Sequence, residues 1–292
     1  MTAGRRISLL GLAAAAWLAS GLAEAAEARE PLRHRPHCQV GLFCLSAERQ
    51  QERISLWLDS ETDRPLTLAI RLEARNLTGA EPVIRTKLDA PGRRRLALLR
   101  IAVPGDWDLR WRYSFHPGTK PARHDPEAPY RLPYPAGASY RVIQGAEGPF
   151  SHRGALAHAI DWAMPPGSPV LAARAGIVIG LRDGAGPGGP DPERSGQENF
   201  VWLRHRDGTV GHYLHLAAGS LPVGLGDAVA RGQAIGRSGN SGYSTEPHLH
   251  FHVSAPTPMG ADAFETFPLD FDLGASGRGR PIAGQSYRAR LP

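Results

Sequence analysis

The chain has 292 residues, a formal net charge of +6 and only two cysteines. This length exceeds that of one average domain, so we expect two domains, each with its own hydrophobic core. The positive charge favours encounters with anionic surfaces such as cell-wall polymers. The arginines are scattered, and no basic helix or aromatic-and-basic strand pattern is visible, which argues against a nucleic-acid partner.

Residues 1–28 have the pattern of a secretory signal peptide. Arg5 and Arg6 precede an apolar run over residues 7–22, and small residues in A-x-A spacing follow at 23–25 and 26–28. This pattern predicts cleavage near residue 25 or 28. The run is shorter than the roughly 20 residues that a membrane-spanning helix needs, and no cysteine follows it to accept a lipid. We therefore expect an exported protein, periplasmic or secreted, without stable membrane insertion after cleavage.

The two cysteines, Cys38 and Cys44, stand close together just beyond the predicted cleavage region. In an oxidising exported compartment such a pair is typical of a disulfide that closes a small loop. A metal site made from this pair alone would lack ligands, although His37 is adjacent. We predict the disulfide.

Residues 29–118 are predicted to form a small antiparallel β-sandwich-like domain. In "LTLAIRL", alternation places Leu66, Leu68, Ile70 and Leu72 on one face of a strand. Turn signals recur at "SETDRP", "NLTGAEP" and "VPGDWD", and helical patterning is absent. This region carries no recognisable chemistry, so we interpret it as a spacer or docking domain.

A Pro-rich linker is predicted over residues 119–140, followed by a second mainly β domain over 141–258 and a C-terminal extension over 259–292. In the second domain, "RDGT" at 206–209 lies between two alternating runs and predicts a hairpin with Asp-Gly in its turn. Residues 183–199 are too rich in Gly and Pro for regular structure. We expect them to form a long surface loop that borders a cleft.

Histidines are concentrated in the second domain, where eight of the twelve lie after residue 150. A hydrolytic zinc site has three protein ligands drawn from His and carboxylate, with the fourth position left to water. The candidates are His152, His158, Asp161, His205, His212, His215, His248, His250 and His252.

Strand alternation separates some of these candidates. If "HAID" is a strand, His158 and Asp161 are three apart and point to opposite faces, whereas a turn at Gly154 could bring His152 beside Asp161. His212 and His215 are also three apart, so one of them is expected to face the site. His205 has no evident partner, and we interpret it as a solvated residue.

The stretch "PHLHFH" places three histidines on one face of a strand, each separated from the next by roughly 7 Å. His248, His250 and His252 could therefore share one reaction centre. Of the three, His252 has no assigned role, and we interpret it as a solvated or supporting neighbour.

Three segments in order, "SHRGALAHAIDWAMPPGSPVLAARAGIV", "YLHL" and "GNSGYSTEPHLHFHV", strongly resemble the lysostaphin-like (LytM-type) zinc metallopeptidases of family M23. The resemblance covers about residues 130–256. It implies a small antiparallel β core with a groove, one Zn²⁺ per chain, and cleavage of peptide bonds in peptidoglycan stems or cross-bridges.

Carried onto this chain, the resemblance implies metal ligands His152, Asp161 and His250, and catalytic histidines His215 and His248. Many family members have the first histidine four residues before the aspartate, where this chain has Ala157. A related branch has "SH" before a "YAIDF"-like segment, which favours His152 over His158. Tyr213 and Asn240 could line the groove or be structural strand and turn residues.

The sequence thus predicts an exported zinc metalloendopeptidase that hydrolyses peptidoglycan. No glutamate base of the H-E-x-x-H type is present, so the two histidines outside the ligand set are expected to serve the water and the leaving group. The alternative is a non-catalytic LytM-type domain that binds peptidoglycan or activates a cell-wall amidase. No regulatory protein can be identified from the sequence.

Overall fold

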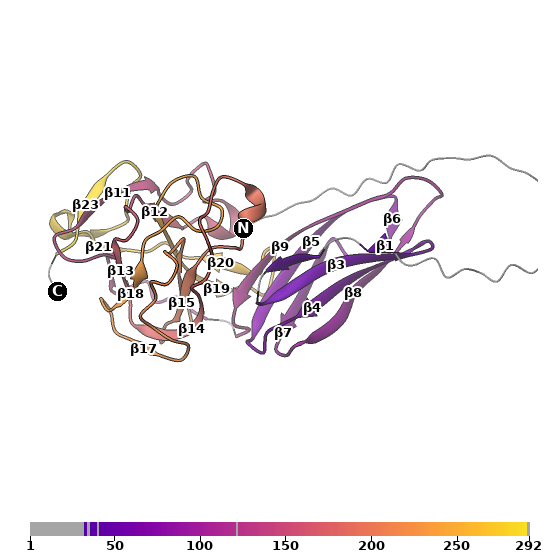
Figure 1. The fold of residues 1–292 in the computed structure, drawn as a ribbon, viewed down its shortest axis with the longest axis horizontal. Coiled ribbons are helices and arrows are strands. Elements are labelled where there is room, and N and C mark those ends of the chain that lie inside the picture. Colours follow the sequence, from indigo (N-terminus) through magenta and orange to yellow (C-terminus); the bar gives the residue numbers. More distant parts are fainter. Residues whose placement is uncertain (1–31, 34–35, 40, 121, 291–292) are drawn as a thin grey trace, which may run out of the picture.

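The computed structural model describes residues 32–33, 36–39, 41–120 and 122–290 (Figure 1). Within these residues the fold is mainly β, as predicted, and contains only short 3₁₀ helices: η1 (Gly154–Leu156), η2 (Pro192–Arg194) and η3 (Gly274–Ser276). The predicted signal peptide lies outside the described residues. Among those described, no helix is both long and apolar enough to span a membrane.

The N-terminal part consists of two antiparallel sheets, which confirms the predicted sandwich. The first sheet has β1 (Leu32–Arg33), β2 (His37–Gln39), β3 (Phe43–Gln50), β4 (Arg53–Ser60), β8 (Gly92–Ile101) and β6 (Leu77–Thr78). The second has β7 (Val83–Leu88), β5 (Leu66–Arg75) and β9 (Asp108–Pro117).

The core of the sandwich follows from strand alternation. Leu66, Leu68 and Ile70 of β5 are fully buried, and they share one core with residues of the first sheet such as Leu56 and Leu58 of β4. Burying each of these leucines stabilises the fold by about 1.5–3 kcal/mol. The predicted disulfide is confirmed: Cys38 of β2 and Cys44 of β3 lie directly opposite each other and are bonded.

The second part is built on a nine-stranded sheet, antiparallel throughout. It contains β17 (Ala228–Val229), β14 (Gly176–Arg182), β15 (Phe200–Arg204), β16 (Val210–Leu214), β19 (Leu249–Pro256), β12 (Ile160–Trp162), β11 (Ser139–Gln144) and β23 (Ser286–Arg288) in this order, with β20 (Phe264–Thr266) paired to β19. The smaller sheets are β13 (Pro169–Leu171) with β18 (Ala234–Arg237), and β10 (Tyr130–Arg131) with β21 (Phe271–Asp272) and β22 (Arg278–Gly279). The hairpin predicted at residues 206–209 joins β15 to β16, and the His205 N–H donates to the Thr209 carbonyl across its turn.

The segments before and after the large sheet pack onto it. In the predicted linker, Tyr130 and Tyr134 are buried in the core of the second part. In the predicted C-terminal extension, β20 and β23 pair with strands of the large sheet. Buried side chains therefore hold the first segment, and strand pairing holds the second. The exact domain boundaries stay predictions.

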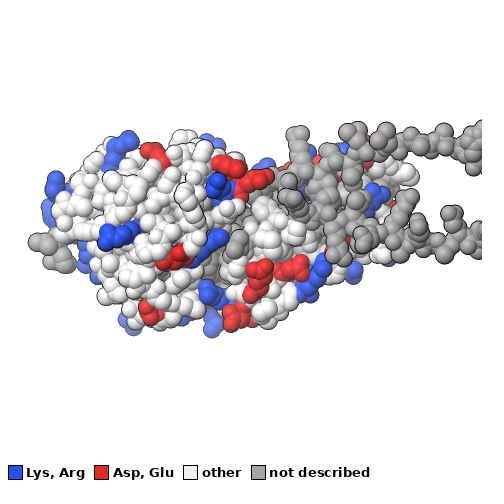
Figure 2. Space-filling model, viewed as in Figure 1, with Lys and Arg blue, Asp and Glu red and all other residues white. Residues whose placement is uncertain are grey.

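The two faces of the large sheet have different partners. Val201, Tyr213 and Phe251 belong to the core of the second part, whereas Trp202 and Leu214 are buried in the core that the sandwich provides. The sandwich therefore covers the face of the large sheet that points away from the core of the second part (Figure 1). On the surface drawn in Figure 2, Lys and Arg side chains are interspersed with acidic ones, consistent with the scattered arginines of the sequence.

Candidate metal centre

Alternation along β19 separates its apolar and its histidine side chains. Leu249, Phe251 and Val253 enter the core of the second part. His250 and His252 project from the other face, and both are buried. His248 immediately precedes the strand and forms a single β-bridge with Gly239. The three histidines of "PHLHFH" thus share one face, as the pattern predicted.

Asp161 of β12 lies directly opposite His250 of β19 in the strand register. Directly opposite residues have Cβ atoms about 4.5–5.5 Å apart, and the side chains meet: His250 Nδ1 is 2.8 Å from Asp161 Oδ1. The Gln144 amide of neighbouring β11 donates to Asp161 Oδ2 at 3.1 Å. Two adjacent strands and one amide therefore fix the carboxylate.

His152 reaches the same carboxylate from a loop. Its Nδ1 is 2.8 Å from the Gly145 carbonyl, and because a carbonyl only accepts, Nδ1 donates. Its Nε2 faces Asp161 Oδ2 at 3.2 Å and has no hydrogen-bond partner although it is fully buried. In a neutral ring this nitrogen carries a lone pair directed at a carboxylate oxygen, and a cation bound between the two atoms would stabilise both.

The buried cluster His152, Asp161 and His250 fits a metal ion. One ligand atom from each residue lies within 4.8 Å of the others. Burial acts to raise the pKa of the Asp161 carboxyl, but its interactions with the neighbouring His250, His152 and His248 outweigh burial and hold that pKa well below its ordinary value. The carboxylate is thus ionised, and two neutral imidazoles with one carboxylate suit a divalent transition metal.

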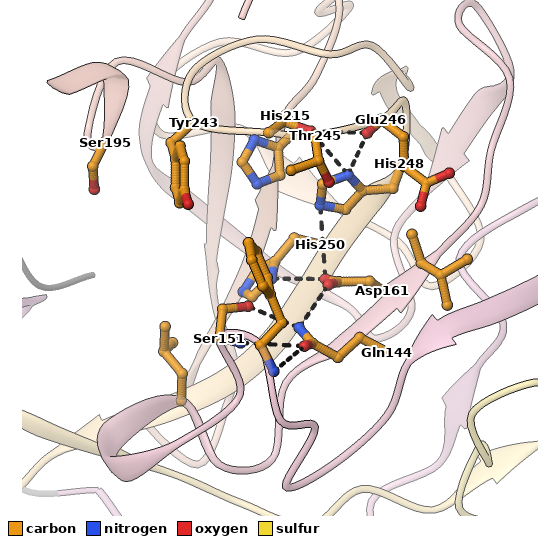
Figure 3. A pocket seen from close by; sticks show the side chains of 14 residues that line it. Gln144, Ser151, Asp161, Ser195, His215, Tyr243, Thr245, Glu246, His248 and His250 are labelled. Atoms are coloured by element: carbon orange, nitrogen blue, oxygen red, sulfur yellow. Dashed lines mark hydrogen bonds and ion pairs between the residues drawn. The ribbon is translucent and has the colours of Figure 1, made fainter. Parts of the chain in front are cut away.

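His215 and His248 lie on the open side of this cluster (Figure 3). Their ring centroids are 4.5 Å apart. The Nδ1 of His215 donates to the Ser241 carbonyl at 2.8 Å, and that of His248 to the Glu246 carbonyl at 2.7 Å. Each ring therefore uses Nδ1 for a backbone carbonyl, which leaves Nε2 for other partners, and His248 Nε2 is 3.9 Å from Asp161 Oδ1.

The backbone at His215 has an unusual conformation, with φ of 65°. Strand alternation would place His215 on the core face with Tyr213, but β16 ends at Leu214 and the left-handed residue turns the side chain toward the pocket. Such conformations cost about 1–3 kcal/mol in a residue other than glycine and cluster at functional sites. Burial, followed by repulsion from His248 and His250, lowers the pKa of His215 to about 3, so this imidazole is neutral.

Residues 155–260 match the family model described as peptidase family M23. This part of the chain belongs to peptidase family M23. His152 lies just outside the matched residues. Asp161 and the four histidines His215, His248, His250 and His252 lie within them.

The M23 domain is similar to several curated proteins. It is 33% identical over 124 residues to the peptidoglycan DD-endopeptidase ShyA of Vibrio cholerae serotype O1, covering 41% of this chain and 26% of ShyA. It is 30% identical over 149 residues to lysostaphin of Staphylococcus staphylolyticus, covering 51% of this chain and 28% of lysostaphin. An uncharacterized metalloprotease of Buchnera aphidicola is 31% identical over 130 residues, covering 43% of this chain and 31% of that protein. The chain thus spans less than a third of the length of these relatives.

An isolated catalytic domain among the solved structures is matched over most of its length. The catalytic domain of lysostaphin from Staphylococcus simulans is 26% identical and covers 44% of this chain and 87% of its own, with a TM-score of 0.31.

Four other predicted candidates of the M23 domain lie away from the cluster. His158 is in a turn before β12 and not on the strand, and its backbone N–H donates to Thr266 Oγ1. His205 is buried and its Nδ1 is 2.8 Å from the Ala175 carbonyl, so its interpretation as solvated is wrong. Tyr213 is a core residue whose hydroxyl accepts from the Ala173 N–H, and Asn240 is not among the residues that line the pocket.

His252 is buried and contacts His250, so of its two interpretations the supporting neighbour fits and the solvated neighbour does not. Its Nδ1 is 3.0 Å from His250 Nε2, and its ring stacks on His212 with centroids 4.3 Å apart. Burial, together with His212 and His250, lowers the pKa of His252 well below its ordinary value, which keeps it neutral. When His250 Nδ1 holds a metal, its Nε2 carries the proton and donates to His252.

Gln144 is a functional residue that the sequence analysis missed. Besides binding Asp161, its Nε2 donates to Ser151 Oγ, and its Oε1 accepts from the N–H groups of Phe150 and Ser151. It therefore holds the loop that carries His152. A side chain at Gly148 would clash with it, since a Cβ there would lie 2.3 Å from Gln144 Cγ.

The first prediction concerns the choice of ligand. We expect His152→Ala to lose bound metal and His158→Ala to keep it, because only His152 reaches Asp161. Metal content per folded chain, measured by inductively coupled plasma mass spectrometry beside the wild type, checks this. Loss of metal in His158→Ala alone would reverse the assignment.

The second prediction concerns the partner of His250. We expect His252→Phe to weaken metal affinity by about 10- to 100-fold, because the ring keeps its stacking but can no longer accept from His250 Nε2. Competition with a chelator measures the affinity. His212→Phe is the matched control, since His212 stacks on His252 and bonds to Ser254 Oγ but does not touch the cluster. Equal affinity in both variants would exclude this role.

Proposed function

We propose that this chain is an exported zinc metalloendopeptidase that hydrolyses peptide bonds in peptidoglycan. The observation that carries the proposal is the buried cluster of His152, Asp161 and His250 with two further imidazoles on its open side, within an M23 domain. His152, Asp161 and His250 would hold the ion. Zn²⁺ bound by such a set lowers the pKa of a coordinated water to about 7 and polarises a carbonyl oxygen.

The proposed roles of His215 and His248 follow from their hydrogen bonds. Because Nδ1 of each donates to a carbonyl, each can take a proton at Nε2 during attack and return it to the leaving amine. A protonated Nε2 can also donate to the oxyanion of the tetrahedral intermediate. The Ser241 and Glu246 carbonyls fix the rings, so little reorganisation is needed during the reaction.

A peptide substrate suits the pocket in front of these histidines. The pocket has a volume of about 230 Å³ and is bordered by Phe150, Tyr243 and Ser195. Phe150 and Tyr243 stack at its rim with ring centroids 6.4 Å apart, and Ser195 belongs to the loop predicted to border a cleft. Peptidoglycan as the substrate is supported by the name of the relative ShyA.

Export is supported by two features outside the M23 domain. The disulfide between Cys38 and Cys44 is typical of an oxidising compartment, and the first 28 residues have the signal-peptide pattern. The net charge of +6 would favour approach to an anionic wall. Periplasmic and secreted locations both fit these features.

The alternative, a non-catalytic LytM-type domain, depended on Ala157 standing where many relatives have the first histidine. The missing histidine at position 157 no longer supports this alternative, because His152 lies beside Asp161. With His215 and His248 also in the pocket, no required group is missing.

Metal removal is the direct test of the proposed function. We expect dialysis against a chelator to abolish the release of soluble fragments from purified peptidoglycan and Zn²⁺ to restore it, because the imidazole and carboxylate ligands match zinc. Mass spectrometry of the fragments identifies the bond that is cut. Full activity in a chain shown to be metal-free would contradict the proposal.

The two imidazoles outside the ligand set give a separate prediction. We expect His215→Ala and His248→Ala each to lower kcat/KM by about 10²- to 10⁴-fold, because each removes a proton-transfer group. The measured metal content should stay at the wild-type level. The control is His158→Ala, which removes an imidazole outside the pocket and should leave the rate unchanged. If either variant instead lost metal, that histidine would be a ligand.

A further inference from the structure

A second cleft continues from the metal pocket toward the sandwich. It has a volume of about 530 Å³ and shares five lining residues with the metal pocket. The shared residues are Phe150, Ser151, Leu156, Ser195 and Tyr243. The two spaces therefore form one groove, and a peptide bound across the metal cluster would extend into the second cleft.

Both parts of the chain form this cleft. Arg71 of β5 and Arg112 of β9 line it from the sandwich. Arg153, which follows the proposed ligand His152, lines it from the M23 domain together with Asp262. The N-terminal part is thus a wall of the proposed substrate groove, although it contains none of the proposed metal ligands.

Hydrogen bonds hold this wall in place. The Arg85 guanidinium of β7 donates to the backbone carbonyls of Thr257, Gly260 and Asp262, at 3.0 Å for Gly260 and 2.7 Å for Asp262. The Ala263 N–H donates to Ser114 Oγ of β9 at 2.8 Å. Because Ser114 also lines the cleft, the position of the arginines relative to the metal cluster is set by direct contacts.

The charge of the cleft is mainly positive. Arg71 and Arg112 lie directly opposite each other in the β5–β9 register, so their side chains leave the same face of the sheet. Like charges in such a pair are destabilising, and stability therefore does not explain them. The nearest compensation is Glu73, whose Oε1 is 3.8 Å from Arg112 Nε, and both side chains are half exposed.

The positive charge of Arg71 is not balanced by a neighbouring carboxylate in this way. Among the described residues, no acidic group lies within ion-pair distance of its guanidinium. Three arginines line the cleft against one acidic residue, Asp262. A guanidinium binds a carboxylate through two parallel hydrogen bonds, so paired arginines at the end of a peptide groove form a site for a carboxylate.

We propose that Arg71 and Arg112 bind a free carboxylate of an acidic peptide substrate, at a position beyond the scissile bond. This inference rests on the proposed peptidase function and makes the sandwich a specificity-determining part of the enzyme. The occupant is a carboxylate-bearing peptide because the cleft is continuous with the pocket in which a peptide bond would be cut.

The test uses two synthetic cross-linked peptides that differ only in whether the acidic side chain is a free carboxylate or its amide. We expect the metal-loaded wild type to favour the free carboxylate by roughly tenfold in kcat/KM, mainly through KM. The double variant Arg71→Gln/Arg112→Gln should lose this preference with kcat nearly unchanged. Arg100→Gln on β8, an exposed arginine outside the cleft, is the matched control and should keep it.

Equilibrium binding of the same two peptides separates the two proposals. Calorimetry with wild type and double variant reports the carboxylate preference whether or not the peptide is cut. A preference in binding without cleavage would contradict the peptidase function and support the carboxylate site. Cleavage without any preference, or a preference that the double variant keeps, would overturn the carboxylate site. Competition by polyphosphate in a protein that shows no peptide preference would point to a phosphate polymer instead.

Discussion

The buried carboxylate of Asp161 is the constraint on which the site depends. A charge removed from water is costly unless it is paired and hydrogen-bonded, and Asp161 is surrounded by groups that meet this requirement. His250 and His152 approach its two oxygens, and the Gln144 amide donates to one of them. The buried His152 Nε2 is the exception, because it has no hydrogen-bond partner, and a cation shared with the carboxylate would satisfy both groups.

This requirement explains why the site is assembled from adjacent strands. β12 and β19 place Asp161 and His250 opposite each other, and β11 supplies Gln144 from the next position in the sheet. Strands that exchange backbone hydrogen bonds hold side chains more firmly than loops do. His152 is the proposed ligand that comes from a loop, and it is held by the Gly145 carbonyl and by the hydrogen bonds of Gln144 to that loop.

Period-two patterns predicted much of this arrangement. Leu66, Leu68 and Ile70 were placed correctly in a core, and His248, His250 and His252 correctly on one face, because alternation depends only on local backbone geometry. The pairing of Cys38 with Cys44 followed from their spacing and the expected compartment. These features need no knowledge of how distant segments pack.

The features that the sequence did not predict depend on long-range packing or on backbone exceptions. The place of His215 depends on one left-handed residue at the end of β16, which breaks the alternation. Gln144 binds Asp161 on a neighbouring strand and the backbone of a loop. A single glutamine has no sequence pattern from which these contacts could be predicted. The burial of His205 and His252 depends on distant segments, because Tyr130 packs against His205 and Phe264 against His252.

The two faces of the large sheet explain why the sandwich and the site belong together. Every strand exposes two faces, and the M23 core covers only one of them. The other face carries His250 and His252 at one end, and beside them lie Trp202 and Leu214, which would expose apolar surface to water if nothing packed on them. The sandwich covers that surface, with Phe115 of β9 against Trp202. A domain fixed by this burial is thereby brought to the edge of the metal pocket, where its exposed residues can contact a substrate that the M23 core alone would leave in solvent.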